Sequence, residues 1–515
     1  MEEIKKEKQK FFHNNVLFFM LLIFLTIIVS WLGSLLNWQA TYGRINPIIG
    51  KLEGTVVAVE NLLSVDGIRY IFGNAITNFI TFTPLGLIII SLIGIGMAYY
   101  SGLLTVIFQF IGKKLTKFWL TFLVVIIGII SNFVGDMGYV ILIPLSAIFF
   151  LVNNRNPIIG IIVSFVSVAA GYGINFVATN LDYSLTPYTR LASALVVDNY
   201  NLSLYSNIFF TITTTIILAF FITYITEKFI ITKVPKYRHD DNFLLEEVVI
   251  NKKVLRGLVL AGLGFIIVSL IFIYLLIPGL PSSGLLLDIN ETTYLGKLFG
   301  SNSYFSQSII YMIVLLMIIC GWLYGLGART IKNKKQFNEA LYSNLNNIGP
   351  LLLLIFLASQ FINLFRTSNI GIVVTVWLGD FINALAFTSI PLIILFILAV
   401  GISNLLLTSS VTKWSILSPI IIPIFMKTNI TPEFTQAIYR VSDSVTNIIT
   451  PALIYFVIFI GFIEIYTKSE NKASIFYYYK ILLIYSLAIL GLWLFVLVAW
   501  YILGLPIGVN VWPTA

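Results

Sequence analysis

Apolar runs of 20 or more residues recur along the whole sequence, and they limit the fold more than any other feature. A run of about 20 apolar residues is long enough for one helix to cross a bilayer. Of the 515 residues, 58% are hydrophobic and only 10% are charged, whereas soluble domains carry about 25% charged residues. We therefore predict an all-α, polytopic membrane protein whose backbone polar groups are satisfied within helices or by neighbouring protein.

The composition also excludes several classes of protein. One cysteine, Cys320, and two histidines, His13 and His239, provide neither a disulfide framework nor a zinc-type cluster. No segment matches the G-x-x-x-x-G-K-[ST] motif that holds nucleotide phosphates, which argues against an ATP-driven pump working alone. The net charge of +9 follows membrane topology rather than nucleic-acid binding. We expect no metal and no organic cofactor.

Nine full spans and two re-entrant helical hairpins are predicted from the apolar runs and their polar breaks. The first run is predicted to be an uncleaved helix rather than a signal peptide, because its apolar core has roughly 20 residues and no A-x-A-like cleavage site follows. The two longest runs, near 116–153 and 387–427, are broken in the middle and form the predicted hairpins. The nine spans are expected near 15–37, 83–111, 157–186, 204–227, 254–279, 305–328, 346–365, 432–462 and 478–504.

The distribution of lysine and arginine supports this topology. With a cytoplasmic N-terminus, 22 of them fall in inside segments and seven, including Arg366, in outside segments, while Lys413 and Arg440 lie at membrane depth. Such an excess of positive residues is typical of cytoplasmic loops. The sequence thus predicts a protein of the bacterial cytoplasmic membrane with its C-terminus outside.

The second half of the chain resembles the first at an offset of close to 270 residues. The segment ISNFVGDMGYVILIPLSAIFF (130–150) corresponds to ISNLLLTSSVTKWSILSPIIIPIFM (402–426), and a helix with a polar, Asn-containing break follows each. Four spans precede the helix near 254–279 and four follow it, so we predict an inverted second copy. The alternative is a chance match of short Ile/Ser/Asn strings. The predicted organisation is a first repeat over 1–227, a cytoplasmic loop and linking helix over 228–304, and an inverted second repeat over 305–515.

Polar residues at the predicted breaks form the candidate transport site. Inverted repeats with broken helices are typical of secondary transporters that bind substrate near the midplane. Freed amides at half-helix N-termini favour anions, and freed carbonyls can hold Na⁺ or a proton donor. The polar hairpin-tip residues are Ser131, Asn132 and Gly135 in the first half and Ser403, Ser409 and Ser410 in the second. The coupling ion is expected to be a proton; if it is sodium instead, the alternative, its site would lie near Asn132, Asp182, Asn404 or Asn447.

The segment YRVSDSVTNIITPALIYF (439–456) places Arg440 and Asp443 three residues apart, hence on one helical face. Two functional alternatives follow: the side chains neutralise each other, or Arg440 binds a substrate carboxylate while Asp443 titrates. A buried pair that only stabilises the fold would also explain them. Ionisable groups inside a membrane are functional by default, and Pro451 would free a backbone carbonyl in the same region.

Three other side chains are candidates for proton coupling or substrate binding. Asp182 occupies the matching break in the first half, where a partly desolvated carboxylate suits proton coupling. Asp136 at the first hairpin tip is a further candidate, with capping of the hairpin's own helix as the alternative. Trp414 at the second hairpin would stack on an aromatic substrate, although packing is a more common role for such a residue.

Six ordered segments, four of which contain candidate residues, resemble the p-aminobenzoyl-glutamate transporter (AbgT) family over most of the chain. The resemblance implies nine helices, two re-entrant hairpins, an inverted repeat and a bowl-shaped homodimer, and the dimer rests on the resemblance alone. The segments are NFITFTPLGLIIISLIGIGMAYYSGLL (78–104), SNFVGDMGYVILIPL (131–145), NFVATNLD (175–182), ASQFINLFRTSNIG (358–371), SNLLLTSSVTKWSILSPIIIPIFM (403–426) and YRVSDSVTNIITPALIYF (439–456).

The resemblance also implies a substrate class and a set of site residues. Family members are associated with uptake of p-aminobenzoyl-glutamate, a folate breakdown product, and with proton-driven export of p-aminobenzoate and sulfonamide antimetabolites. Two departures concern substrate detail: Val411 stands where some members have a small hydroxyl residue, and AYYSG (98–102) has two tyrosines where charged residues are expected. The implied substrate-site residues are Asn404, Trp414, Pro432, Arg440, Asp443 and Pro451, with coupling at Asp182 and Asp443.

The leading hypothesis is a secondary transporter, acting as an antiporter, that moves an aromatic carboxylate. Arg440 would orient the carboxylate, Trp414 would stack on the ring, and Asn404 with the tip hydroxyls would bind the polar edge. Asp443 and Asp182 would take up and release protons. A sodium-coupled carrier of dicarboxylates or other organic anions is the alternative. A third hypothesis, an intramembrane enzyme that uses the two aspartates as a catalytic pair, lacks a recognisable motif.

Overall fold

The computed structural model describes residues 15–46, 51–135, 137–235, 237, 248–346, 348–467 and 474–514. Within these residues the fold is almost entirely helical. Nine helical segments of the described chain are long and apolar enough to cross a membrane. The predicted class, an all-α polytopic membrane protein, is therefore confirmed.

The nine candidate spans agree with the predicted spans in number, but they are not formed by the same nine segments of the sequence. Two of them, Lys117–Val134 and Ser389–Leu406, are the first arms of the predicted hairpins. Conversely, the predicted spans near 157–186 and 432–462 are each divided into two shorter helices by their polar breaks. The segments that coincide with predicted spans are α2 (Asn15–Leu35), α5 (Thr83–Tyr100), α11 (Ile208–Ile225) with η2 (Thr226–Ile230), α12 (Lys252–Leu276), α14 (Phe305–Ala328), α16 (Gly349–Thr367) and α22 (Ile475–Leu503).

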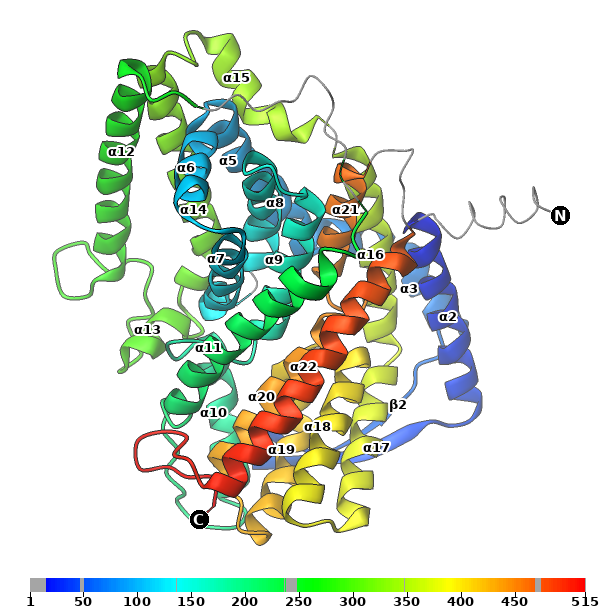
Figure 1. Cartoon of the computed structure of the whole chain (residues 1–515). Helices are drawn as coiled ribbons and strands as arrows, with labels where there is room; N and C mark the ends of the chain where they lie inside the picture. The colour runs from blue at the N-terminus through cyan, green and yellow to red at the C-terminus, as the bar shows by residue number, and fades with distance from the viewer. Residues whose placement is uncertain are drawn as a thin grey trace.

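Helices α2 and α12 lie at opposite edges of the molecule (Figure 1). Their outward faces are apolar, and side chains such as Phe24 on α2 and Leu270 on α12 are more than half exposed. Continuous apolar surfaces of this kind are covered by lipid or by another chain rather than by water. These two helices therefore mark the outer boundary of the bundle.

Each half of the chain contains a helical hairpin followed by a broken helix. The elements of the first half are α7 (Lys117–Ile130), η1 (Ser131–Val134), α8 (Met137–Val152), α9 (Pro157–Gly171) and α10 (Asn180–Ser193). Those of the second half are α18 (Ser389–Leu406), α19 (Ser410–Lys427), α20 (Pro432–Asn447) and α21 (Phe456–Tyr466). The order of elements is the same in both halves, at offsets of roughly 270 residues. The inversion of the second half and the re-entrant course of the hairpins stay predictions.

Proline and glycine determine where several of these helices begin and end. Pro157 and Pro432 occupy the first turn of α9 and α20, where the missing N–H removes no helical hydrogen bond. Gly135 follows η1 with φ = 89°, a conformation that glycine adopts without steric penalty. At Gly173, in the first break, an added Cβ would lie 2.5 Å from the carbonyl oxygen of Arg440. The first break therefore packs directly against the backbone of α20.

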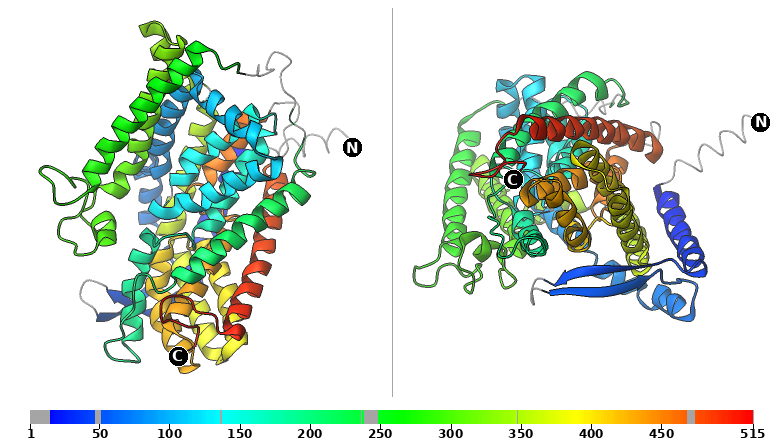
Figure 2. Two further views of the ribbon diagram at one scale, coloured as in Figure 1. Left: turned by 60° about the vertical axis from the view of Figure 1, so that its left-hand side comes forward. Right: turned by 90° about the horizontal axis from the view of Figure 1, so that it is seen from below.

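Two parts of the fold correct the sequence-based expectation. Strands β1 (Gln39–Asn46) and β2 (Lys51–Ala58) pair antiparallel and form a ribbon at the edge of the molecule near α2, so the chain is not wholly helical (Figure 2). The expected single helix near 83–111 is two helices, because Gly102 with φ = 91° separates α5 from α6 (Leu103–Lys114). The remaining short elements are α3 (Val65–Gly73), α4 (Ala75–Ile80), α13 (Tyr294–Phe299), α15 (Lys334–Tyr342) and η3 (Ser343–Leu345).

An unpredicted helix, α17 (Ile370–Leu385), connects α16 to the second hairpin. Asn369 with φ = 58° separates α17 from α16. The junction lies against the hairpin tip, since an added Cβ on Gly371 would lie 3.0 Å from the carbonyl oxygen of Leu406. Arg366, which the charge count assigned to an outside segment, consequently lies beside the tip of the second hairpin.

Helices α9 and α20 lie in the interior of the bundle. Every side chain of α9 is buried, and in α20 only Thr446 is not fully buried. Helix α9 carries no charged residue, whereas α20 buries Arg440 and Asp443. Because a buried charge without a partner is strongly destabilising, α20 requires opposite charges from neighbouring elements.

Candidate functional site

Two buried ion pairs lie at the polar breaks, and one of them connects the two halves of the chain. Arg440 on α20 pairs with Asp182 in the first turn of α10, and its second guanidinium nitrogen lies 3.2 Å from the other carboxylate oxygen. Lys413 on α19 pairs with Asp443, which lies about one turn further along α20. All four side chains are buried. Because the four charges sum to zero, no charge in this cluster is left uncompensated.

The end of helix α10 also holds the Asp182 carboxylate. Its Oδ2 accepts hydrogen bonds from the backbone N–H of Thr179 at 2.8 Å and from the Thr179 hydroxyl at 2.9 Å. This is a capping interaction, which places the negative charge at the positive end of the helix dipole. On the partner side, Nε of Arg440 is buried and has no hydrogen-bond partner among the described residues. Asp182 thus links the first break to α20 through one bidentate contact.

Lys413 is the site residue that the sequence analysis missed. Its ammonium donates to Oδ1 of Asp443 and, at 2.7 Å, to Oδ1 of Asn404. The Ser410 hydroxyl donates to the other carboxylate oxygen of Asp443. The Asn404 amide donates to the carbonyl oxygen of Asp443 at 2.7 Å and to Oδ1 of Asn447 at 2.8 Å. The signal was present in the sequence, because a lysine within an apolar run needs a carboxylate partner.

Of the alternatives that the sequence left open for Arg440 and Asp443, the structure contradicts mutual neutralisation, and substrate binding by Arg440 with a titrating Asp443 stays a prediction. The two residues lie on the same helix, but they do not neutralise each other. Arg440 is paired with Asp182 instead, and Asp443 with Lys413. For Arg440 to bind a substrate carboxylate, as predicted, its pair with Asp182 would first have to open.

Trp414 is packed inside the protein and lines neither of the two cavities described below. The side chain is fully buried, and its ring stacks on Tyr439 with 4.4 Å between ring centroids. Its Nε1 donates to the Thr189 hydroxyl at 2.8 Å, and this hydroxyl donates to Gln436 at 2.5 Å. The network joins α10, α19 and α20. The predicted stacking on a substrate ring would require Trp414 to separate from Tyr439.

A cavity of about 230 Å³ lies where the hairpins, the breaks and the end of α16 meet. Ser410 belongs to this cavity and also donates to Asp443, so one hydroxyl connects the cavity with the buried Lys413–Asp443 pair. The residues that line it are Tyr139, Tyr172, Arg366, Thr408, Ser409, Ser410, Val411, Asn447, Leu453, Ile454 and Tyr455.

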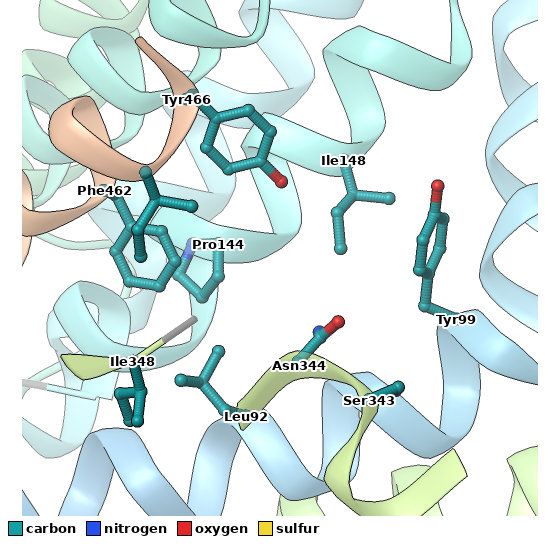
Figure 3. Close-up of a pocket in the computed structure, with 10 residues that line it drawn as sticks. Leu92, Tyr99, Pro144, Ile148, Ser343, Asn344, Ile348, Phe462 and Tyr466 are labelled. Atoms are coloured by element: carbon teal, nitrogen blue, oxygen red, sulfur yellow. The ribbon is translucent and has the colours of Figure 1, made fainter. Parts of the chain in front are cut away.

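A second cavity, of about 160 Å³, is formed by α5, α8, η3 and α21 (Figure 3). None of the described side chains that line it carries a charge, so it offers no group that would bind a carboxylate strongly. Its lining residues are Leu92, Tyr99, Pro144, Ile148, Ser343, Asn344, Ile348, Phe462, Ile465 and Tyr466. The 230 Å³ cavity is therefore the candidate substrate site.

The remaining predicted residues lie at different distances from this site. Pro451 lies in the second break, and Ser403 shares a 2.6 Å hydrogen bond with Thr375. Pro432, however, lies about two turns, or roughly 12 Å, from Arg440 along α20, next to the C-terminal segment. The structure does not bring Pro432 to the site. Asp136 lies outside the described residues.

The first hairpin tip is polar but carries no ion pair within the described residues. Ser131 donates to the carbonyl oxygen of Gly128 at 2.7 Å. The Asn132 amide donates to the carbonyl oxygen of Val168 at 3.0 Å, and its own Oδ1 is buried with no described partner. Among the described residues, the two hairpin tips therefore differ, since Lys413 and its partner Asp443 lie at the second tip.

Comparison with known proteins identifies the family. The model of the AbgT putative transporter family matches residues 1–514. The chain belongs to the AbgT family of transporters. It is a multi-pass membrane transporter and not an enzyme, so the hypothesis of an intramembrane catalytic pair is wrong. The resemblance found in the sequence motifs is therefore confirmed.

Three relatives illustrate how far the similarity extends. The chain is 28% identical over 497 residues to the p-aminobenzoyl-glutamate transport protein of Escherichia coli (strain K12). The aligned region covers 96% of this chain and 94% of that protein. The crystal structure of the Alcanivorax borkumensis YdaH transporter is 28% identical in sequence, covers 96% of this chain and 100% of its own, and gives a TM-score of 0.48. The structure of Neisseria gonorrhoeae MtrF, from a class of antimetabolite efflux pumps, is 30% identical, covers 97% of each chain and gives a TM-score of 0.48.

Proposed function

We propose that this AbgT-family transporter moves aromatic carboxylates of the p-aminobenzoate and p-aminobenzoyl-glutamate type, driven by protons. The substrate class is supported by the name of the Escherichia coli relative, and export of antimetabolites is supported by the description of MtrF. The resemblance to the family implies that these antimetabolites are sulfonamides. The proposal includes the bacterial cytoplasmic membrane, a cytoplasmic N-terminus, an outside C-terminus and a homodimer.

The observation that carries the proposal is the buried Lys413–Asp443 pair next to the 230 Å³ cavity. Ser410 lines the cavity and donates to Asp443. A proton on Asp443 would remove the negative charge that faces Lys413. Because a buried ammonium without a counter-charge is strongly destabilising, α19 and α20 would then have to move apart or admit a new partner. Protonation is thereby coupled to a change at the cavity wall.

The Arg440–Asp182 pair supplies a second coupling point, between the two halves of the chain. The two residues are 258 positions apart in sequence and belong to α20 and α10. Protonation of Asp182 would weaken this contact and permit one half to move relative to the other. Movement of one repeat against the other around a central site is the expected mode of alternating access.

The second hairpin favours protons over sodium as the coupling ion. Sodium would need oxygen ligands such as those of Asp443 and Asn404, and the Lys413 ammonium already occupies both. Asn132 at the first tip is different, because its buried Oδ1 has no described partner. A sodium-coupled carrier of dicarboxylates or other organic anions is therefore the second candidate function.

Transport assays in liposomes distinguish these functions. The purified full-length protein would be reconstituted, and uptake of labelled p-aminobenzoate would be followed under an imposed pH gradient and, separately, an imposed sodium gradient at constant pH. Concentrative uptake with the pH gradient alone is the expected result, with protein-free liposomes as the control. Uptake that needs sodium would favour the second candidate. If neither gradient drives uptake of p-aminobenzoate, the proposed substrate is contradicted.

A further inference from the structure

Three cationic side chains lie close to the tip of the second hairpin, and two of them are neutralised. Arg440 is paired with Asp182, and Lys413 is paired with Asp443. The side chain of Arg366 has no hydrogen bond or ion pair with any described residue, and it lines the 230 Å³ cavity. The cavity wall therefore carries a positive charge for which the described protein supplies no counter-charge.

The other polar groups around the cavity are suited to an anion. Thr408, Ser409, Ser410 and Asn447 contribute hydroxyl and amide groups, and none of the described lining residues is Asp or Glu. The Ser409 side chain is exposed, and its hydroxyl donates to the Thr412 hydroxyl at 2.8 Å, so it would have to turn away from Thr412 to donate to a ligand. A planar guanidinium binds a carboxylate through two parallel hydrogen bonds, and neighbouring hydroxyls can donate to the same oxygens.

Aromatic side chains form another part of the same wall. Tyr139 and Tyr455 stack with ring centroids 5.0 Å apart and their planes 5° from parallel, and Tyr172 lines the cavity beside them. An apolar cavity of about 150 Å³ holds a benzene ring. The volume of about 230 Å³ therefore accommodates one aromatic ring with a carboxylate.

We propose that Arg366 binds the carboxylate of a single-ring aromatic acid in this cavity, with Ser409 as a further donor and the three tyrosines beside the ring. The proposal rests on the proposed function and names the residue that recognises the substrate anion. It assigns to Arg366 the role that the sequence suggested for Arg440. A bound carboxylate would also lie near Ser410 and compete for the hydroxyl that now donates to Asp443, which links substrate binding to the buried ion pair.

The test compares a charged ligand with its uncharged counterpart. Binding of p-aminobenzoate and of p-aminobenzamide to the purified full-length protein would be measured for Arg366→Gln, Arg366→Lys and the control Arg190→Gln. Arg190 is a matched control, because it is also an exposed arginine in the last turn of a helix. We expect Arg366→Gln to weaken p-aminobenzoate binding by about 10- to 100-fold, the range for a hydrogen-bonded charge, and to change p-aminobenzamide binding less than about twofold.

Two further outcomes separate the ligand role from a structural role. Arg366→Lys keeps the positive charge without the planar guanidinium, so it should lose part of the affinity for p-aminobenzoate. If Arg366→Gln does not elute as folded protein, Arg366→Lys replaces it in the comparison of the two ligands. Unchanged p-aminobenzoate affinity in Arg366→Gln, or an equal loss for both ligands, would overturn the proposal.

Failure of the proposed substrate is distinguishable from failure of this inference. If the wild-type protein binds neither ligand, thermal stabilisation by benzoate is measured for the wild type and Arg366→Gln. Stabilisation of the wild type alone supports the carboxylate site at Arg366 even though the proposed substrate is wrong. Stabilisation of both proteins, or of neither, overturns the inference.

Discussion

The two hairpin tips begin with the same residues, Ile-Ser-Asn, and yet the second asparagine has different partners from the first. Asn132 donates to backbone carbonyls, including that of Val168, and its Oδ1 has no described partner. Asn404 donates to Asp443 and Asn447, and its Oδ1 accepts from the Lys413 ammonium. One motif therefore serves as a backbone anchor in one half and as part of a charged network in the other.

The difference arises from the helices that pack behind each tip. Neither α8 nor α9 carries a charged residue, so the first tip has no ion pair available from them. Helices α19 and α20 supply Lys413, Arg440 and Asp443, and the charge that balances Arg440 comes from Asp182 in the first half. Three of the four buried charges therefore belong to the second half, and the first half contributes Asp182.

Removing Asp443 from the charged second tip should have the largest effect on stability and transport. Asp443→Ala leaves the Lys413 ammonium buried and unpaired, which should lower the free energy of unfolding by about 3–5 kcal/mol and abolish pH-driven uptake. The double variant Lys413→Met with Asp443→Leu contains no unpaired charge, so it should regain most of the stability and still lack coupling. Thermal unfolding and liposome uptake measure the two effects. Normal gradient-driven uptake by Asp443→Ala would refute the coupling role.

Breaking the contact between the halves should have the next largest effect. Asp182→Asn removes the charge that faces Arg440 and weakens the cap of α10, and we expect a loss of about 2–4 kcal/mol together with at least tenfold slower uptake. Asp198→Asn, at an exposed position, is the control. If both variants transported at the wild-type rate, the ion pair would be only a structural contact.

Close packing of the first break against α20 can be tested at glycine. In Gly173→Ala, the added Cβ would lie 2.5 Å from the carbonyl oxygen of Arg440, and overpacking of this kind typically costs about 1–3 kcal/mol. Gly262→Ala on α12 is the control, since nothing lies within 4 Å of its Cβ position and alanine favours a helix by about 1 kcal/mol. Equal melting temperatures for the two variants would show that α20 yields easily at this point.

Alanine substitution of Asn132 and of Asn404 compares the two hairpin tips directly, and we expect the smallest effects on transport from these variants. Asn404→Ala removes an acceptor from Lys413, so we expect pH-driven uptake to fall by about tenfold, as for the loss of one hydrogen bond to a charge. Asn132→Ala should reduce the same rate only about twofold and leave it independent of sodium. A sodium-dependent rate in the wild type that disappears in Asn132→Ala would place the coupling ion at the first tip instead.

Much of the site was predictable from residue types, and the pairing was not. The polar breaks, the burial of Asp182, Arg440 and Asp443, and the lysine at membrane depth all follow from local sequence against an apolar background. The helix spacing that places Arg440 and Asp443 on one face suggested a mutual pair, but it says nothing about which side chains of other helices face them. Trp414 was likewise recognised, while its stacking on Tyr439 depends on how α19 packs against α20.

By itself the sequence determined the membrane class, the positions of most long helices and of the polar breaks, and the family, because hydropathy, helix-breaking residues and motif order are local properties of the chain. Only the tertiary structure decided that Asp182 neutralises Arg440, that Lys413 neutralises Asp443, and that Arg366 lines the cavity instead of lying in a loop. The physical reason is that each buried charge is satisfied by whichever opposite charge packing brings within reach, and that choice is made between segments far apart in sequence.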